Sequence, residues 1–379
     1  MEILTSVLIC GVVPYRCLDY MEYDREMIRR VARNLIKEGV LKMEHCCNEK
    51  VLVFTPRGLE NIENGKLETA VSENLLQFYK SISRQYKNVA RRSEESEARR
   101  ALQNSDVMMF MHYSGIGSFF SEKLSLSELS SNPGVGQYYS LKDIRDIYDI
   151  GITNTAVSSK KQKVNVGTRA ISSTRANGVV FSPEGKTYVV YGISTKPPVW
   201  FRSGEMGFLT RVRRIAQDRR MKSEDEGIIL YSGDSVLEKI LNYKKSRGFA
   251  TMNIDLSLDH MYAIPEDAYG QIFINIIMEA DWQKKILSKV LTLDEIEGAK
   301  RASILVDGYS LASRVYSCVF CVPDLVKLKS IQQHAKAAQD PSGFIIYCYE
   351  YQESFIRSNF EGLAQIKVVG FKDVVGDLS

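Results

Sequence analysis

The feature that most constrains this chain is a basic amphipathic segment close to its N-terminus. Residues 23–37, YDREMIRRVARNLIK, place apolar side chains at intervals of three and four residues, which is the spacing of an α-helix. Asp24 lies near the start of the segment, where a carboxylate stabilises a helix N-terminus, and Gly39 follows it as a stop signal. The segment therefore predicts a surface helix whose outer face is rich in arginine.

Strand-forming and helix-forming segments surround this helix in a fixed order. Residues 40–45 and 50–54 are interpreted as two strands of a β-hairpin. Thr55 is followed by proline, a combination that favours the start of another helix. Two shorter helices are expected before the basic segment, over residues 3–9 and 15–20. The first part of the chain is thus predicted to combine helices with a single hairpin.

Three helices, a hairpin and the sequence FTPRGLE resemble the winged-helix family over residues 1–65. The resemblance implies that the third helix enters the major groove of DNA and that the hairpin, or wing, touches the backbone. An alternative is a winged helix used for protein contact, which Glu26 and a net charge of only +2 over residues 1–100 favour. The side chains expected to contact DNA in this unit are Arg25, Arg29, Arg30, Arg33, Lys37, Lys50 and Arg57.

Positive charge is concentrated in the middle of the chain. The net charge of all 379 residues is only +4, but residues 151–250 carry 18 basic and 8 acidic residues, a net charge of +10. Such a block indicates a polyanion as partner, although a solvated basic face would look the same. Its densest stretch has the period of an amphipathic helix. The DNA-contacting residues predicted there are Arg211, Arg213, Arg214, Arg219 and Arg220.

The remainder of the chain is expected to be a helical linker over residues 66–105 and an α/β domain over residues 106–379. From residue 227 onward strand and helix patterns alternate, which indicates a sheet flanked by helices and leaves room for a subdomain. No GxxxxGK[ST] or GxGxxG motif is present, so we expect no nucleotide site. The aspartates that follow apolar runs, interpreted as helix caps, are Asp234, Asp307 and Asp324.

One hairpin in this domain resembles the core of the restriction-endonuclease-like fold. It consists of an Arg-x-Asn-Gly turn at residues 175–178, a short strand over 179–181 and a second strand over 186–193. The resemblance implies an aspartate before the first strand and a Glu/Asp-x-Lys motif on the second, which together hold Mg²⁺ and activate water. Neutral residues stand at those places here, so we expect no metal-dependent cleavage. The degenerate motif comprises Asn177, Gly192, Ser194 and Lys196.

Cysteine and histidine positions indicate no metal site. The seven cysteines are an odd number without the spacing of a disulfide scaffold, and the four histidines are scattered. Cys318 and Cys321 form a CxxC on an expected strand, but no second pair completes a zinc site, so we interpret them as buried thiols. Cys46 and Cys47 are adjacent near the expected wing and receive no role. We expect no metal and no other cofactor.

The whole chain resembles the replication-relaxation family, which is encoded beside relaxase and coupling genes on plasmids and integrative elements of Firmicutes. The resemblance rests on the winged-helix start, the charged helical spacer and the hairpin RANGVVFSP. It implies an α/β (α+β) fold, a winged helix followed by a nuclease-like domain, and DNA binding at a transfer or replication origin.

The expected function is that of a non-catalytic accessory protein that assists a relaxase or replication protein. Two alternatives stay open, a divergent metal-dependent nuclease or relaxase and a winged-helix transcriptional regulator. The expected partner is duplex DNA, with single-stranded DNA, a relaxase, replication or coupling protein, and a second copy of the chain as open alternatives. No apolar run is long enough for a membrane span, so a cytoplasmic location is expected.

Overall fold

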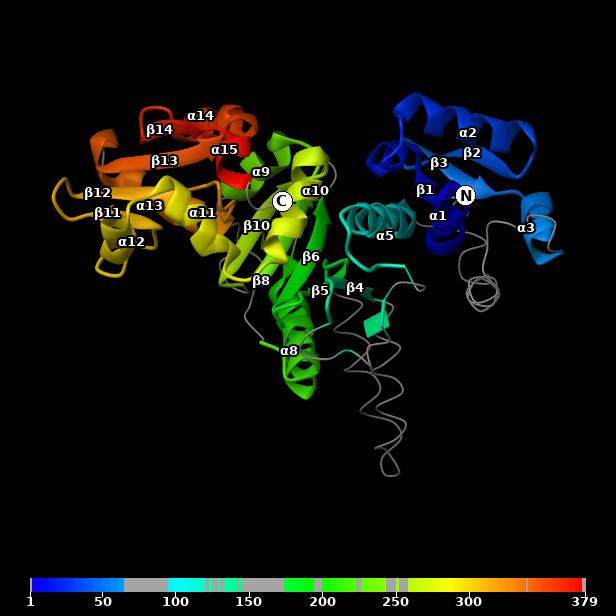
Figure 1. The fold of residues 1–379 in the computed structure, drawn as a ribbon, viewed down its shortest axis with the longest axis horizontal. Helices are drawn as coiled ribbons and strands as arrows, with labels where there is room; N and C mark the ends of the chain where they lie inside the picture. The colour runs from blue at the N-terminus through cyan, green and yellow to red at the C-terminus, as the bar shows by residue number, and fades with distance from the viewer. Residues whose placement is uncertain are drawn as a thin grey trace.

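The computed structural model describes most of the chain. The described residues are 2–64, 95–119, 123–124, 129, 133–141, 143–144, 174–193, 200–222, 226–242, 250–251, 258–338 and 340–376. They form a mixed α/β structure with several sheets, which agrees with the expected fold class. An N-terminal unit and a C-terminal sheet lie at opposite ends of the long axis, with a central sheet between them (Figure 1). Among the described helices, none has the length and apolar content that a membrane span requires.

The N-terminal unit, residues 2–63, contains the elements expected from the sequence. A three-stranded antiparallel sheet in the order β1-β3-β2 is surrounded by helices. The expected helices and hairpin are confirmed, with one difference, since residues 15–20 form a 3₁₀ helix. The elements are α1 (Glu2–Cys10), β1 (Val13–Pro14), η1 (Tyr15–Tyr20), α2 (Arg25–Lys37), β2 (Leu41–Cys46), β3 (Glu49–Phe54) and α3 (Pro56–Glu63).

Local hydrogen bonds explain where these helices begin. The Asp24 carboxylate accepts a hydrogen bond from the Met27 N–H at 2.9 Å and so caps α2. The Thr55 hydroxyl accepts from the Gly58 N–H at 2.9 Å and caps α3. Gly58 is needed there because a Cβ atom would lie 2.1 Å from the Val40 carbonyl oxygen. The FTPRGLE sequence thus fixes the approach of α3 to the base of the hairpin.

The central sheet has the strand order β10-β8-β6-β5-β4. Strands β4, β5 and β6 form an antiparallel meander, and β8 and β10 run parallel to β6. Side chains alternate between two hydrophobic cores, so that α5 and α10 cover one face and α8 and α9 cover the other. The elements are α5 (Glu95–Tyr113), β4 (Gln137–Ser140), β5 (Gly178–Phe181), β6 (Thr187–Ile193), α8 (Arg202–Asp218), β8 (Glu226–Tyr231), α9 (Asp234–Leu241), β10 (His260–Pro265) and α10 (Ala268–Ile277).

The C-terminal sheet has the order β11-β12-β13-β14, with β12, β13 and β14 parallel. The alternation of strands and helices expected from residue 227 is confirmed. The two sheets meet where the Ala263 N–H of β10 donates to the Pro323 carbonyl at 2.8 Å. The elements are α11 (Trp282–Val290), α12 (Leu293–Ala299), β11 (Gly308–Ser310), β12 (Val315–Val319), α13 (Leu325–Ala338), β13 (Phe344–Tyr349), α14 (Glu353–Phe360), β14 (Gln365–Val369) and α15 (Phe371–Val375).

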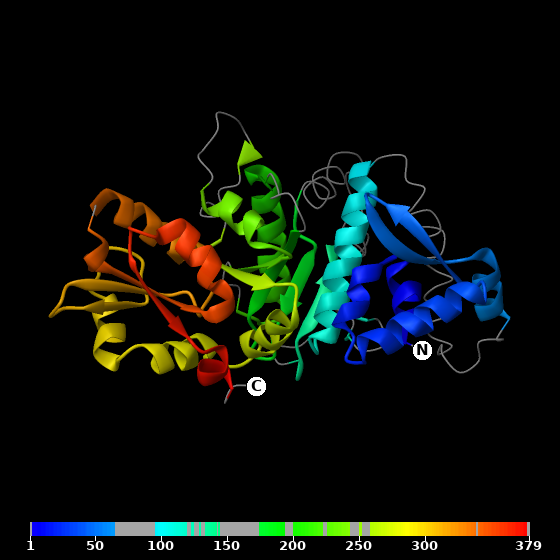
Figure 2. The same cartoon turned by 90° about the horizontal axis from the view of Figure 1, so that it is seen from above.

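The N-terminal unit packs directly against α5. One hydrophobic core runs from α1 through α5 to the central sheet. Within it the Tyr20 and Phe110 rings pack edge to face, with their centroids 5.4 Å apart. Figure 2 shows α5 lying between the N-terminal unit and the central sheet. The expected boundary at residue 105 falls inside α5, and residues 66–94 of the expected linker lie outside the described residues.

Gly58→Ala is expected to lower the free energy of unfolding by about 2 kcal/mol, since its Cβ meets backbone that cannot rotate away. Gly233→Ala is the matched control because a Cβ at Gly233 has nothing within 4 Å. Urea unfolding of both variants measures the difference. Equal stability of the two variants would show that the close approach at Gly58 is not required.

Candidate nucleic-acid interface

Helix α2 presents a polar face away from the rest of the N-terminal unit. Ile28 and Ala32 are buried against the unit, while the opposite side of the helix is exposed. Arg30 and Lys37 lie on the exposed side and have no acidic partner among the described residues. They are the two cations of α2 best placed to meet a phosphate group or a base edge.

The other three arginines of α2 are engaged in ion pairs. Arg25 and Arg29 share one carboxylate, Asp19, with nitrogen–oxygen distances of 2.5 and 3.1 Å. Arg33 pairs with Glu26 at 3.4 Å, and both of these side chains are more than half exposed. Such exposed pairs contribute little to stability and can open for another anion. The basic stripe expected from the sequence is therefore partly compensated by the unit's own carboxylates.

An apolar stripe lies beside these cations. Met27 and Val31 are 37% and 38% exposed, and their four-residue spacing places them next to one another on α2. Tyr23, which precedes the helix, is 53% exposed and adds a third exposed apolar side chain. Apolar side chains on a helix in the major groove contact the methyl group of thymine. The same stripe is also suited to a protein partner, so it does not distinguish the two uses.

The hairpin does not project freely into solvent. At its tip Cys46 is buried, and it packs in one cluster with Ala98 and Leu102 of α5. Lys50 and Arg57 remain exposed, one on β3 and the other on α3. The hairpin is thus fixed to α5 at its tip, while Lys50 on the hairpin and Arg57 on α3 remain accessible.

Helix α8, which ends at Asp218, and the turn that follows it carry the second predicted set of cations, and one member does not fit. Arg211 is only 8% exposed and faces the core, which corrects its expected role as a phosphate contact. Arg214 and Arg220 are exposed, and Arg213 and Arg219 are half-buried. Helices α2 and α8 lie well apart in both views (Figures 1 and 2), so they do not form one continuous surface.

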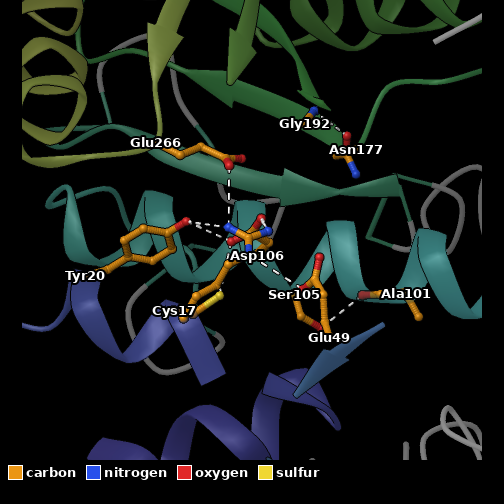
Figure 3. A network of polar contacts seen from close by, with 10 residues as sticks. Cys17, Tyr20, Glu49, Ala101, Ser105, Asp106, Asn177, Gly192 and Glu266 are labelled. Atoms are coloured by element: carbon orange, nitrogen blue, oxygen red, sulfur yellow. Dashed lines mark hydrogen bonds and ion pairs between the residues drawn. The ribbon is translucent and has the colours of Figure 1, made fainter. Parts of the chain in front are cut away.

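Two members of the degenerate nuclease motif, Asn177 and Gly192, lie side by side (Figure 3), and with Asn104 they form what we call the amide lock. The Asn177 Oδ1 accepts from the Gly192 N–H at 2.7 Å, and its Nδ2 donates to the Asn104 Oδ1 at 2.8 Å. A Cβ at Gly192 would lie 2.5 Å from a methyl group of Val107, so no larger side chain fits there without movement. The lock fastens β5 and β6 to α5. Ser194 and Lys196 lie outside the described residues.

A buried carboxylate on the opposite face of β6 was not predicted. Glu205 lies in the first turn of α8 and accepts from the Thr174 hydroxyl at 2.7 Å, the Arg175 N–H at 2.6 Å and the Tyr191 hydroxyl at 3.1 Å. Burial raises the pKa of Glu205, and these three donors partly oppose the rise. The carboxylate anchors α8 to β6. The sequence carries no signal for it because its side-chain partners are distant in the chain.

A second unpredicted cluster, the Arg16 network, joins the N-terminal unit to the rest (Figure 3). The guanidinium of Arg16 forms a short ion pair with Asp106 of α5 and lies 3.5 Å from Glu266, which follows β10, and 3.6 Å from Glu49 of β3. The Tyr20 hydroxyl donates to Asp106 at 2.9 Å. Burial, and next the charge of Asp106, raise the pKa of Glu266. The network thus connects η1, β3, α5 and the end of β10.

Two of the three aspartates expected to be helix caps do not cap a helix. Asp307 is buried and pairs with Lys327 at 2.6 Å, and Asp234 lies inside α9, whose N-cap is Gly233. Only Asp324 matches, since it accepts from the Val326 N–H at 3.0 Å at the start of α13. It also pairs with the His260 Nδ1 at 2.7 Å. For Asp307 and Asp324, a side chain elsewhere in the chain supplies an ion pair that local sequence does not indicate.

The cysteines agree with the expectation of reduced, mostly buried thiols. Cys318 and Cys321 are buried and unpaired, as expected.

Among the described residues, no group of three or more His, Cys, Asp or Glu side chains is arranged to hold a metal ion. Comparisons with protein-family models, curated proteins and solved structures found no match.

Arg16→Ala is expected to lower the free energy of unfolding by about 3 kcal/mol, because it leaves Asp106 and Glu266 buried without their cation. Arg25→Ala removes an arginine from an exposed ion pair with Asp19 and should cost at most about 1 kcal/mol. Urea unfolding at neutral pH compares the two variants. A loss no larger for Arg16→Ala than for Arg25→Ala would contradict a central role of the network.

His260 is expected to make stability depend on pH. The hydrogen bond to Asp324 raises the pKa of His260, with the charge of Glu226 adding to the rise and burial and Lys327 opposing it. The stabilisation should be complete below the unfolded pKa of about 6.5 and lost as pH rises through the raised folded value.

Unfolding of wild type and His260→Asn at acidic and alkaline pH tests this expectation. The stability advantage of wild type should shrink by on the order of 1 kcal/mol as pH rises. His334→Asn, an exposed histidine of α13, is the control. An advantage that is constant with pH, or that grows as pH rises, would contradict the assignment.

Proposed function

We propose that this chain is a DNA-binding protein that contacts duplex DNA through α2. The observation that carries the proposal is the exposed face of α2, with Arg30 and Lys37 free of acidic partners among the described residues. An α-helix fits the major groove, and arginine binds both phosphate and guanine edges. The three helices and the β1-β3-β2 sheet support a winged-helix arrangement in which α2 is the recognition helix.

We infer a restriction-endonuclease-like core for the central sheet. The order α5, β4, β5, β6, α8, β8 supports it, because an antiparallel meander is followed by a helix and a strand parallel to its last member. In the amide lock, the positions expected to hold carboxylates have an amide and a glycine. A divalent cation of the Mg²⁺ type prefers carboxylate oxygens. The proposed role is therefore non-catalytic, and nicking of DNA with Mg²⁺ would contradict it.

The biological setting that we propose is an origin of a mobile element. The protein would bind there and assist a relaxase or replication protein, as the resemblance to the replication-relaxation family implies. The rigid attachment of the N-terminal unit to α5 supports an architectural role, because DNA on α2 would be held at a fixed position relative to the central sheet. Binding of the protein at its own promoter instead would favour a transcriptional regulator.

Fluorescence anisotropy with duplex and single-stranded DNA at several salt concentrations tests the proposal. Arg30→Ala/Lys37→Ala should weaken duplex binding at least about tenfold and reduce the dependence of log K on log salt by up to about 2. Lys336→Ala/Lys372→Ala removes the same charge from exposed positions of α13 and α15 and should leave binding unchanged. If the α2 variant binds DNA with wild-type affinity, the DNA contact does not lie on α2.

A second candidate function is protein contact through α2, which the exposed stripe of Tyr23, Met27 and Val31 favours. A second copy of the chain is the simplest partner to examine. Sedimentation of wild type and Val31→Glu would then show a dimer that the substitution dissociates. If wild type binds neither duplex nor single-stranded DNA and Val31→Glu dissociates a dimer, protein contact through α2 would replace DNA binding as the proposed function.

A further inference from the structure

Cys47 differs from every other cysteine of the chain. All seven cysteines are described; six are buried and Cys47 is half-exposed. Its nearest thiol belongs to Cys46, and the two Sγ atoms are 4.0 Å apart. Since reactivity of a thiol toward oxidants depends on its exposure, Cys47 is the thiol that a small oxidant in solution reaches first.

The backbone holds this pair in an uncommon conformation. Cys47 and Asn48 form the two-residue turn between β2 and β3, and their φ angles are +52° and +69°. Asparagine and glycine are the usual residues for such a turn, whereas cysteine seldom adopts a positive φ. The turn places Cys47 at the tip of the hairpin, where it packs in part against the cluster in which Cys46 is buried with Ala98 and Leu102 of α5.

We propose that Cys46 and Cys47 form a modification site at which a hydroperoxide converts two thiols into a vicinal disulfide. In the first step the Cys47 thiolate attacks a peroxide oxygen, the O–O bond breaks, and a sulfenic acid and water form after proton uptake. In the second step the Cys46 sulfur attacks the sulfenic sulfur, the S–S bond forms, and the S–O bond breaks to release a second water. Two electrons pass from the thiols to one peroxide.

The environment supports this order of attack. Burial, followed by the neighbouring Cys47, raises the pKa of Cys46 to about 11, so Cys46 is the less reactive thiol of the pair in the first step. Consecutive Cα atoms are about 3.8 Å apart, which is shorter than the usual span of a disulfide. The ring is therefore strained, and strained disulfides are readily reduced again. The modification would be reversible.

The site lies where oxidation can alter the attachment of the hairpin. Cys46 and Cys47 both pack on the cluster that contains Ala98 and Leu102, so closing the ring is expected to alter this packing. Glu49, three residues along the chain, reaches Arg16 at 3.6 Å and so belongs to the Arg16 network. Oxidation at the tip is thus expected to loosen the contact between the hairpin and the first half of α5.

Peptide mapping after treatment of the full-length protein with hydrogen peroxide tests the proposal. Trypsin releases Met43–Lys50, in which Cys46 and Cys47 are the only cysteines, and Val315–Lys327, which contains Cys318 and Cys321. The first peptide should become about 2 Da lighter than its reduced form and recover with glutathione. The second is an internal control and should keep both thiols, because both are buried.

Hydrogen exchange measures the structural consequence. Oxidised wild type should exchange faster over residues 95–102 than reduced wild type, whereas peroxide-treated Cys47→Ser should match its untreated form. The proposal is overturned if Met43–Lys50 retains two alkylatable thiols, carries only a sulfinic acid, or is linked to another copy of the chain. Equal oxidation of Met43–Lys50 and Val315–Lys327 would likewise show that peroxide does not react preferentially with Cys46 and Cys47. These outcomes do not depend on whether the protein binds DNA.

Discussion

The ion pair between Arg16 and Asp106 is the interaction on which the arrangement of the whole molecule depends. A carboxylate buried without a partner would be strongly unfavourable, so Asp106 requires the guanidinium and the Tyr20 hydroxyl that η1 supplies. The same guanidinium serves Glu266 at the end of β10. Because these groups come from η1, α5 and the end of β10, they are satisfied together only when the N-terminal unit sits on α5 in one orientation. Apolar packing supplies most of the energy, and the charges determine the orientation.

Helix α5 therefore links two regions that the sequence presents as separate. On one side it receives the N-terminal unit, and on the other its Asn104 takes part in the amide lock with Asn177. A side chain at Gly192 would collide with Val107 of the same helix. A carboxylate side chain in place of Gly192 would therefore require α5 to move away from β6. If α2 binds DNA as proposed, the central sheet would serve as a scaffold for it.

The sequence predicted what is encoded locally and missed what depends on distant partners. Apolar spacing and the caps Asp24 and Thr55 were sufficient to place α2 and α3, because a helix end is satisfied within one turn. Periodicity could not reveal that Arg211 turns into the core, since a long aliphatic stem suits an apolar face as well as a polar one. Asp307 resembled a helix cap, but its partner is Lys327, twenty residues away. The Arg16 network joins residues 16, 106 and 266, a combination that no local pattern contains.

Counting arginines on α2 overstates its attraction for a phosphate backbone. Arg25 and Arg29 share Asp19, and Arg33 faces Glu26, so these five side chains carry a net charge of +1. Each exposed pair is worth at most about 1 kcal/mol, so a phosphate can displace the carboxylate at little cost, but the displaced carboxylate then repels the phosphate. Discrimination between sequences would therefore depend more on Arg30 and the neighbouring apolar stripe than on total charge. A surface with this little net charge favours a ligand whose shape matches it over a ligand attracted by charge alone.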